Sequence, residues 1–396
     1  MDPPAIVSSK TIAPTDGDNM QPQSQTPYSK GRQRAALFLV LLLAFLVRLP
    51  SLLTGYPNSQ DVRDYEQWGE IIKQSGFPSA YQNPAIDYPP ILVYVIGATA
   101  IAEEHLGAWD ANPRPDHSLV AFVLQILTTL TDLLTAALLA LIFLPRSTRL
   151  AILVAALYSF NPVILYITTV WGQTDSVYVL PLLASIVALE RRAILPAWLL
   201  YTLAVATKIQ SIALAPLFLT WTLARHGLRG LIAGISIGAA TFAVICGPWL
   251  LSGNLSGLLR PFIAPGEGRI DVSGYNLWYL VTLGNLRLKS SLQPFGLPIT
   301  YQLIGDILFF LFACLISYMA VRRNNGLALP SAILSLGMFM LMTDIHERHA
   351  YPAIAFLLYY AAERTVNRST QSAQPTRDPR AAWVAYALVT TTIFFN

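Results

Sequence analysis

Hydrophobic residues dominate long stretches of this chain, and polar residues gather in the segments between them. Roughly 20 consecutive apolar residues are needed for an α-helix to cross a bilayer. Runs of about this length, or somewhat shorter, recur at 35–54, 119–144, 149–167, 173–189, 193–207, 209–224, 229–251, 301–320, 327–343, 349–363 and 381–395. The pattern predicts an all-α polytopic membrane protein with about eleven transmembrane helices.

The composition supports a chain that faces lipid. Of the 396 residues, 54% are hydrophobic and only 12% are charged, whereas soluble domains have about 25% charged residues. A soluble globule of this length could not bury so much apolar surface, so a secreted enzyme and a nucleic-acid-binding domain are both excluded. Membrane lipids are expected partners and nucleic acid is not. The net charge of +4 adds little, because cytoplasmic loops of membrane proteins are rich in Lys and Arg.

The chain divides into three parts by composition. Residues 1–34 are rich in Pro, Ser, Gln and Thr, which predicts a disordered cytoplasmic tail. Residues 35–363 form the predicted transmembrane module. Residues 364–396 are expected to form a cytoplasmic linker followed by one last transmembrane helix.

The run 89–102 decides the orientation of the chain. It is short and begins with two prolines, as interfacial or re-entrant segments often do. If this run does not cross the membrane, four short loops that each carry a pair of arginines lie inside together with the tail, as the positive-inside rule requires. The four pairs are Arg146 and Arg149, Arg191 and Arg192, Arg225 and Arg229, and Arg322 and Arg323. We therefore predict an inside N-terminus, with 55–118, 252–300 and 343–349 outside.

The first outer loop contains a helical pattern that follows an aspartate. Tyr65, Trp68, Ile71 and Ile72 have the spacing of an apolar helix stripe, which predicts a short amphipathic helix lying on the membrane with Tyr and Trp at the interface. Asp61 stands just before this helix. Its carboxylate could cap the helix or serve chemistry, and the pattern leaves both readings open.

Three further polar sites interrupt apolar sequence. Lys208 lies between the runs 193–207 and 209–224, where a cation is costly unless it meets an anion or reaches the lipid phosphates by snorkelling. The turn 346–349, His-Glu-Arg-His, is either an exposed turn or a phosphate site, since a guanidinium and an imidazolium suit that anion. Asp132 lies inside an apolar run, where it could pair with an Arg or His, hold the fold or line a cavity.

The order of these motifs resembles a known family. Asp-Tyr-Pro-Pro (87–90) is followed by Asn-Pro…Trp-Gly-Gln-Thr-Asp (161–175), Lys-Ile-Gln (208–210) and His-Glu-Arg-His-Ala-Tyr-Pro (346–352). Over residues 35–363 the chain resembles the polytopic GT-C glycosyltransferases, and within them the bacterial and archaeal proteins related to the GPI second mannosyltransferase.

The resemblance implies a GT-C fold with membrane-surface helices in the first outer loop and an inverting transfer of one sugar. Asp61 corresponds to the base that deprotonates the acceptor, with Asp64 as the rival assignment. A divalent metal held by these two carboxylates is compatible with the chemistry but not required by it. The residues expected to bind substrate are Asp64, Tyr65, Tyr88, Trp171, Gln173, Asp175, Lys208, Gln210, His346, Glu347 and Arg348.

The implied function is transfer of a hexose, mannose rather than glucose, from a polyprenyl-phosphate donor to a glycan or lipid acceptor. The site would face the outside of the plasma membrane or, in a eukaryote, the lumen of the endoplasmic reticulum. A transporter or a flippase for lipid-linked sugars is the main alternative, and it predicts ionisable residues strung through the membrane. A scaffold subunit with an inactive site is the third hypothesis.

Overall fold

The computed structural model describes residues 27–55, 59–106, 118–263, 268–370 and 378–396, and the first helix starts earlier than the sequence suggested. Helix α1 spans Pro27–Thr54. Most of the predicted tail, residues 1–26, lies outside the described residues, but 27–34 belong to α1, so the predicted boundary was wrong there. Pro27 stands at the start of the helix, where proline is tolerated, and the helix continues through Gly31 into the apolar run.

The described secondary structure is helical, apart from an isolated bridge between Arg269 and Lys289. The first outer region contains α2 (Gln60–Ser75), η1 (Phe77–Gln82) and α3 (Pro90–Leu106). The central helices are α4 (Leu119–Phe143), α5 (Thr148–Ser159), α6 (Pro162–Leu165), η3 (Tyr166–Trp171), α7 (Asp175–Glu190), α8 (Ile194–Thr207), η4 (Ile209–Leu214) and α9 (Ala215–Ile245). The remaining elements are α10 (Gly247–Leu251), α11 (Leu255–Ile263), α12 (Leu277–Thr282), η5 (Pro294–Gly296), α13 (Tyr301–Arg323), α14 (Ala328–Leu341), η6 (Glu347–Ala350), α15 (Tyr351–Thr370) and α16 (Arg380–Phe395).

Fewer helices are long and apolar enough to cross a membrane than the eleven that the sequence predicted. In the described part of the chain four helical stretches qualify, namely Gly31–Thr54, Leu119–Phe143, Ile209–Ile245 and Tyr301–Arg323. A fifth is added if Thr148–Ser159 and Pro162–Trp171, which meet at a 42° bend, count as one span. Caps and turns shorten several other runs below the roughly 20 residues that a span needs; Ile194–Thr207 has 14 residues. The protein is an all-α membrane protein, but the eleven-span count is not supported.

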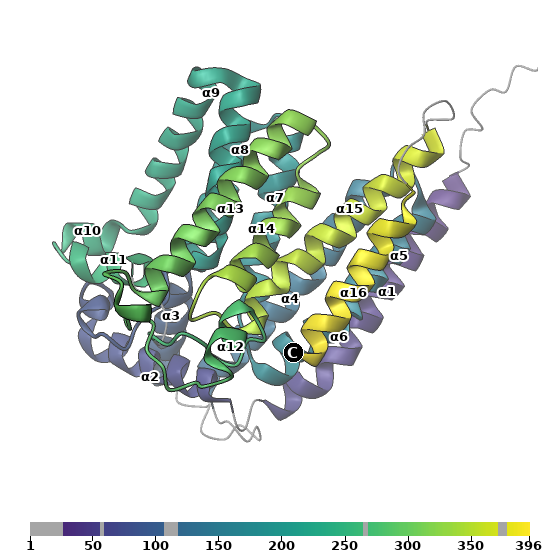
Figure 1. The fold of residues 1–396 in the computed structure, drawn as a ribbon. Helices are drawn as coiled ribbons and strands as arrows, with labels where there is room; N and C mark the ends of the chain where they lie inside the picture. Colours follow the sequence, from purple (N-terminus) through teal and green to yellow (C-terminus); the bar gives the residue numbers. More distant parts are fainter. Residues whose placement is uncertain (1–26, 56–58, 107–117, 264–267, 371–377) are drawn as a thin grey trace, which may run out of the picture.

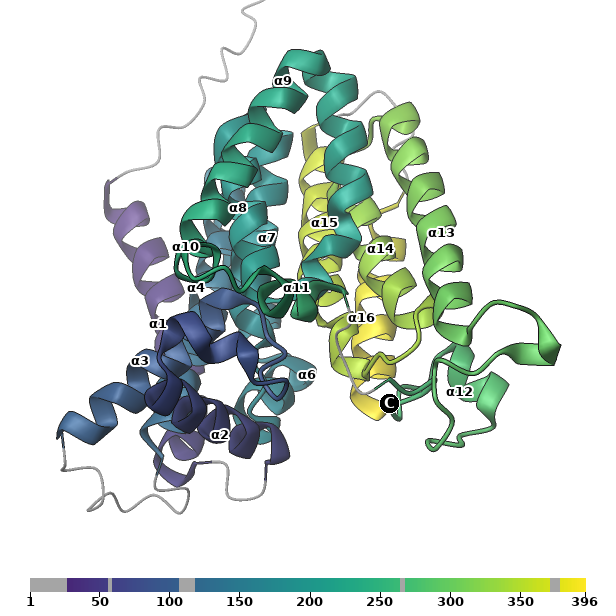
Figure 2. The ribbon, with the colours of Figure 1, turned by 90° about the vertical axis from the view of Figure 1, so that its left-hand side faces the viewer.

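One of these stretches is folded back on itself. Gly227 interrupts α9 with φ 66° and ψ −173°, a conformation that side-chain-bearing residues rarely adopt. Figure 2 shows the two halves of α9 meeting at a sharp turn. The apolar runs 209–224 and 229–251 are therefore helices joined by this turn.

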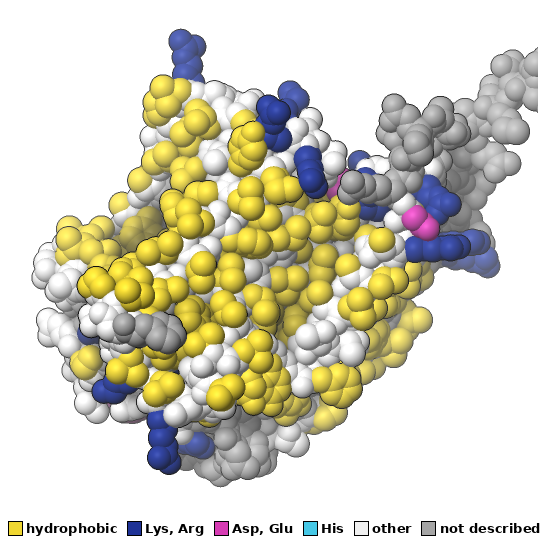
Figure 3. Space-filling view, viewed as in Figure 1, with side chains coloured by type: hydrophobic (Ala, Val, Ile, Leu, Met, Phe, Trp, Pro, Cys, Tyr) yellow, Lys and Arg dark blue, Asp and Glu magenta, His cyan; other side chains and the backbone are white. Residues whose placement is uncertain are grey.

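The arrangement separates a bundle of helices that run side by side from a second group of helices toward one end of it. Figures 1 and 2 show α4, α7, α8, α13, α14 and α15 running side by side, while α2, α3, α11 and α12 gather at one end of them. Hydrophobic side chains cover most of the face in Figure 3, and the Lys and Arg side chains lie toward its margins. Such a broad exposed apolar surface is that of a protein surrounded by lipid.

Helix α2 packs against protein on its apolar side. Its buried residues include Val62, Tyr65, Trp68 and Ile72, and Tyr65 and Trp68 are only 1% and 5% exposed. The stripe does follow the predicted helix, but it faces α3 and α4, so the prediction that Tyr and Trp anchor α2 in the membrane interface was wrong. Gly69 permits this contact, since a Cβ there would lie 2.9 Å from the Cβ of Ala100.

Candidate functional site

Asp61 lies in the first turn of α2, and it does not cap that helix. The N-cap is Ser59, whose Oγ accepts the backbone N–H of Val62 at 3.4 Å. The same hydroxyl donates to the carbonyl of Trp171 at 2.8 Å, which fastens the start of α2 to η3. The capping role considered for Asp61 is therefore filled by another residue, and its carboxylate is free to point elsewhere.

The carboxylate of Asp61 meets two residues that are distant in sequence. Trp171 Nε1 donates to Oδ2 at 3.1 Å across 110 positions, and Arg348 Nη1 donates to Oδ1 at 3.3 Å across 287 positions. The Arg348 guanidinium also lies 5.1 Å from the centre of the Trp171 ring, within cation–π range. The Asp61 side chain is 26% exposed and that of Arg348 is 10% exposed. Three residues of the predicted site thus converge around one partly accessible carboxylate.

Local backbone features present Trp171 and Arg348 to Asp61. Trp171 ends the π-helical turn η3, which follows the bend at Asn161, and Gly172 after it adopts a left-handed conformation with φ 82°. Arg348 lies in η6, whose start is held by His349 Nδ1 accepting the backbone N–H of His346 at 3.1 Å. Both contacts to Asp61 therefore come from short irregular segments between longer helices, as binding residues often do.

A buried anchor below the site holds both segments. Asp132 Oδ2 accepts from Arg48 Nη2 at 3.2 Å and from Thr168 Oγ1 at 3.0 Å, and Oδ1 accepts from Tyr351 OH at 2.7 Å. Thr168 lies three residues before Trp171, and Tyr351 follows η6 at the start of α15. Of the roles considered for Asp132, pairing with an arginine is confirmed.

A second ion pair is more deeply buried. Lys208 Nζ lies 3.0 Å from Asp175 Oδ1, and the two side chains are 3% and 0% exposed. The rings of Tyr88 and Tyr178 flank the ammonium, with centres at 5.5 and 5.9 Å. The snorkelling alternative for Lys208 was wrong, because the chain turns inward to a protein carboxylate and does not reach toward lipid phosphates.

Several buried polar atoms around this pair have no hydrogen-bond partner. They include both amide atoms of Gln173, the hydroxyls of Thr174, Tyr178 and Ser211, and Gln210 Oε1. Buried polar groups in proteins are nearly always hydrogen-bonded. These atoms therefore give the region around Lys208 unused donors and acceptors for a polar ligand.

The two predicted tyrosines form an aromatic cluster with Trp68. Tyr65 OH and Tyr88 OH are 3.2 Å apart, and the three rings have centres 5.0 to 5.7 Å from one another. Burial raises the pKa of Tyr65 well above its usual value, so its phenol stays neutral. Tyr88 joins this cluster to Lys208, whereas Tyr65 is only 1% exposed.

The histidines beside Arg348 carry no charge at neutral pH. Burial, and then the nearby Arg348 guanidinium, lower the pKa of His346 to about 4 and hold that of His349 well below its ordinary value. His349 Nε2 lies 3.0 Å from the side-chain amide of Gln210. The positive charge beside Asp61 in this structure comes from Arg348, and the pairing of a histidine with a phosphate stays a prediction. Burial also raises the pKa of Glu347.

The rival carboxylate, Asp64, lies outside this group of contacts. Its Oδ1 accepts from Gln60 Nε2 at 2.9 Å, and Arg348 and Trp171 both bond to Asp61. Among the described residues no group of three or more His, Cys, Asp or Glu is placed to hold a metal ion. In this structure Arg348 and Trp171 bond to the two oxygens of Asp61 and Gln60 bonds to Asp64, and a metal held by both carboxylates stays a prediction.

Two residues near the site escaped the sequence analysis. Ser59 ties α2 to Trp171, and Tyr178 flanks Lys208. Tyr178 follows Asp175 by three positions on α7, so helical spacing could have placed both on one face. Ser59 stands two positions before Asp61, a place that favours an N-cap serine.

A comparison with models of protein families finds a match over much of the chain. The family model described as "GPI transamidase subunit PIG-U" matches residues 23–261. No curated protein matches the sequence. The matched stretch includes Asp61, Trp171 and Lys208 but ends before Arg348. This is a membrane protein family related to the GT-C-like glycosyltransferase fold, and it is not specifically a mannosyltransferase family. The match covers more than half of the chain. The chain therefore belongs to the PIG-U family of GPI transamidase subunits and is a multi-pass membrane protein.

Proposed function

We propose that this chain is an inverting glycosyltransferase that moves a hexose, mannose rather than glucose, from a polyprenyl-phosphate donor to a glycan or lipid acceptor on the extracytoplasmic face. The single observation that carries the proposal is the convergence of Asp61, Trp171 and Arg348. It unites a carboxylate able to accept a proton with a cation able to hold a phosphate.

The proposed reaction is a single displacement at the anomeric carbon. The bond from that carbon to the donor phosphate breaks, the bond to the acceptor oxygen forms on the opposite face, and Asp61 takes the acceptor's proton. General-base catalysis of this kind contributes about 10²- to 10⁴-fold in rate. The leaving phosphate retains the electrons of the broken bond, and a fixed guanidinium stabilises that developing charge.

Arg348 is suited to this role by its unused donors. Its Nε is buried and has no hydrogen-bond partner, while Nη1 is bonded to Asp61. An arriving phosphate would take over the guanidinium as a bidentate partner and free the Asp61 carboxylate to act as the base. Donor binding would then precede activation of the acceptor.

Lys208 is proposed to belong to the same site, although its side chain is buried away from solvent. It is neutralised by Asp175, so it contacts the donor only if that pair opens, and the unpartnered polar atoms around it favour binding of the sugar nearby. The role of Glu347 is to line the turn that carries Arg348.

The second candidate is a subunit that binds a lipid-linked glycan without transferring its sugar. The description of the family as a transamidase subunit favours it, and so does the internal pairing of Asp61 with Arg348 and Lys208 with Asp175. The transporter alternative is less favoured, because Arg48 and Asp132 in the bundle are bonded to each other and are 0% exposed at their side chains.

The deciding experiment uses the purified full chain with polyprenyl-phosphate mannose and polyprenyl-phosphate glucose, each with and without an added mannose-containing acceptor. Mass spectrometry follows donor loss and product, and Asp61→Asn is the control for background hydrolysis. If the unaltered chain consumes donor and Asp61→Asn does not, the result supports transfer. Donor that binds but is never consumed supports the subunit, and a chain that neither binds nor consumes donor overturns both candidates.

A further inference from the structure

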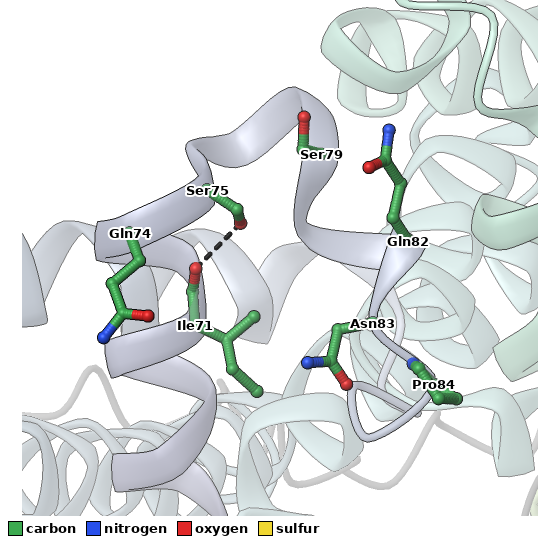
Figure 4. Close-up of a pocket in the computed structure, with 7 residues that line it drawn as sticks. All are labelled: Ile71, Gln74, Ser75, Ser79, Gln82, Asn83 and Pro84. Carbon is green, nitrogen blue, oxygen red and sulfur yellow. Dashed lines mark hydrogen bonds between the residues drawn. The ribbon is translucent and has the colours of Figure 1, made fainter.

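A small cavity, open at the surface, lies at the far end of the helix that carries Asp61, and Gln74, Ser75, Gln82 and Pro84 on its rim are exposed. It has a volume of about 440 Å³ and is lined by Ile71, Gln74, Ser75, Ser79, Gln82, Asn83 and Pro84. Figure 4 shows these side chains around the junction where α2 ends and η1 and the next turn begin. The volume is within the range of small-molecule sites.

The lining is polar and carries no charge. Five of the seven residues have amide or hydroxyl side chains, and Asp, Glu, Lys and Arg are missing from the seven. Amides and hydroxyls both donate and accept hydrogen bonds, as sugar hydroxyls do. A phosphate would lack a cation here and a metal ion would lack a carboxylate. The lining therefore suits a neutral, hydroxyl-rich ligand.

Two of these side chains are available for a ligand and two are committed. Ser75 Oγ donates to the carbonyl of Ile71 at 2.7 Å, and Asn83 Oδ1 accepts from the N–H of Ala85 at 2.9 Å. Within the described part of the chain the amides of Gln74 and Gln82 make no hydrogen bond.

The wall of the cavity is held by buried contacts from elsewhere in the fold. Arg260 Nη2 donates to the carbonyls of Asn83 and Ile86 at 2.7 and 3.1 Å, and Tyr81 OH donates to the carbonyl of Tyr88 at 2.6 Å. Helix α11 and the loop before α3 thus fix the turn. A preformed site spends less binding free energy on ordering its own groups.

The cavity is too far from Asp61 to hold the reacting sugar. Gln74 follows Asp61 by 13 positions on one helix, and a rise of 1.5 Å per residue puts them about 20 Å apart. We propose that the cavity is a subsite for a neutral sugar residue of an extended glycan acceptor, remote from the hydroxyl that reacts. This assignment to the acceptor rests on the proposed glycosyltransferase function, whereas the affinity for a neutral sugar does not. Since no aromatic ring lines the cavity, the affinity is weak and the subsite assists the main one.

The test measures binding of α-mannotriose to the full chain in detergent by saturation-transfer NMR. The variants are Gln74→Ala, Gln82→Ala and the two combined, and the matched control is Gln67→Ala, which alters an exposed glutamine two turns earlier on α2. Each lost hydrogen bond should weaken binding about 2- to 10-fold, and the double variant should weaken it further. The control should bind as the unaltered chain does, and thermal unfolding of all four variants checks the fold.

The outcomes separate this inference from the proposed reaction. If mannotriose binds and only the cavity variants lose it, the subsite stands even if no donor is ever consumed. In an active chain the same variants should also raise KM for a long acceptor and leave KM for a single mannoside unchanged. Absence of mannotriose binding, equal binding by all variants, or displacement of the sugar by a peptide would overturn the subsite, even in a chain that transfers sugar.

Discussion

The pair formed by Arg48 and Asp132 gives the sharpest stability prediction. Arg48 is fully buried, and its guanidinium donates to the carbonyls of Ala44 and Ser159 as well as to Asp132. Replacing Asp132 with leucine leaves this cation buried without a counter-charge. It also removes the acceptor of Tyr351 and Thr168.

The expected loss is about 3–5 kcal/mol for Asp132→Leu, the range found when one partner of a buried ion pair is removed. Arg48→Met should cost less, about 1–3 kcal/mol. The remaining carboxyl can take up a proton, and it still accepts from Tyr351 and Thr168, whereas a guanidinium cannot lose its charge. The double variant Arg48→Met/Asp132→Leu should be more stable than Asp132→Leu alone by about 2 kcal/mol or more, because no charge is then left unpaired.

The assay is unfolding of the four proteins in the same detergent, with each free energy of unfolding compared in a double-mutant cycle. Apparent Tm is the second readout. If the double variant is no more stable than Asp132→Leu, or if the two single effects simply add, the pair is not what holds this part of the bundle and the reasoning fails.

Three further predictions concern the outer face. Asp61→Asn should lower kcat by about 10²- to 10⁴-fold and leave donor affinity equal or tighter, because it removes the carboxylate that pairs with Arg348; Asp64→Asn should be milder, and the reverse order in a transfer assay would reassign the base. Arg348→Ala should raise KM for the lipid-linked donor by roughly 10- to 100-fold, from loss of about 1.5–3 kcal/mol of charged hydrogen bonding, and donor titration with unchanged KM would contradict this. Burial raises the pKa of Asp87 from 3.8 to about 6, so the folded state binds more protons than the unfolded state between these values. The contribution of Asp87 to stability should fall as pH rises through that window and stay lower above it, and the difference in pH-resolved unfolding between the unaltered chain and Asp87→Asn should show this slope.

The sequence by itself determined where helices form. Apolar runs set the bundle, the stripe through Tyr65 and Trp68 set α2, and the proline at the start of 89–102 set the beginning of α3 at Pro90. The motifs also singled out Asp61, Trp171 and Arg348, three residues that meet in space. Local periodicity and short motifs carry this information because neighbouring residues alone produce it.

What covers each apolar face was decided only by the tertiary structure. Lipid tails and protein cores are both apolar, so hydropathy alone could not tell that Tyr65 and Trp68 pack against Tyr88 and not against the membrane. The same ambiguity affected the predicted number of spans, because hydropathy does not distinguish a short apolar helix packed inside a bundle from a short membrane span.

The partners of the charged residues were likewise settled by the fold. Asp61 with Arg348, Lys208 with Asp175 and Arg48 with Asp132 are separated by 287, 33 and 84 positions along the chain. A sequence shows that an intramembrane charge needs a partner but not which one, because the choice depends on helices that meet only after packing. The same packing lowers the pKa values of His346 and His349, because it buries both rings, and no sequence motif encodes that burial.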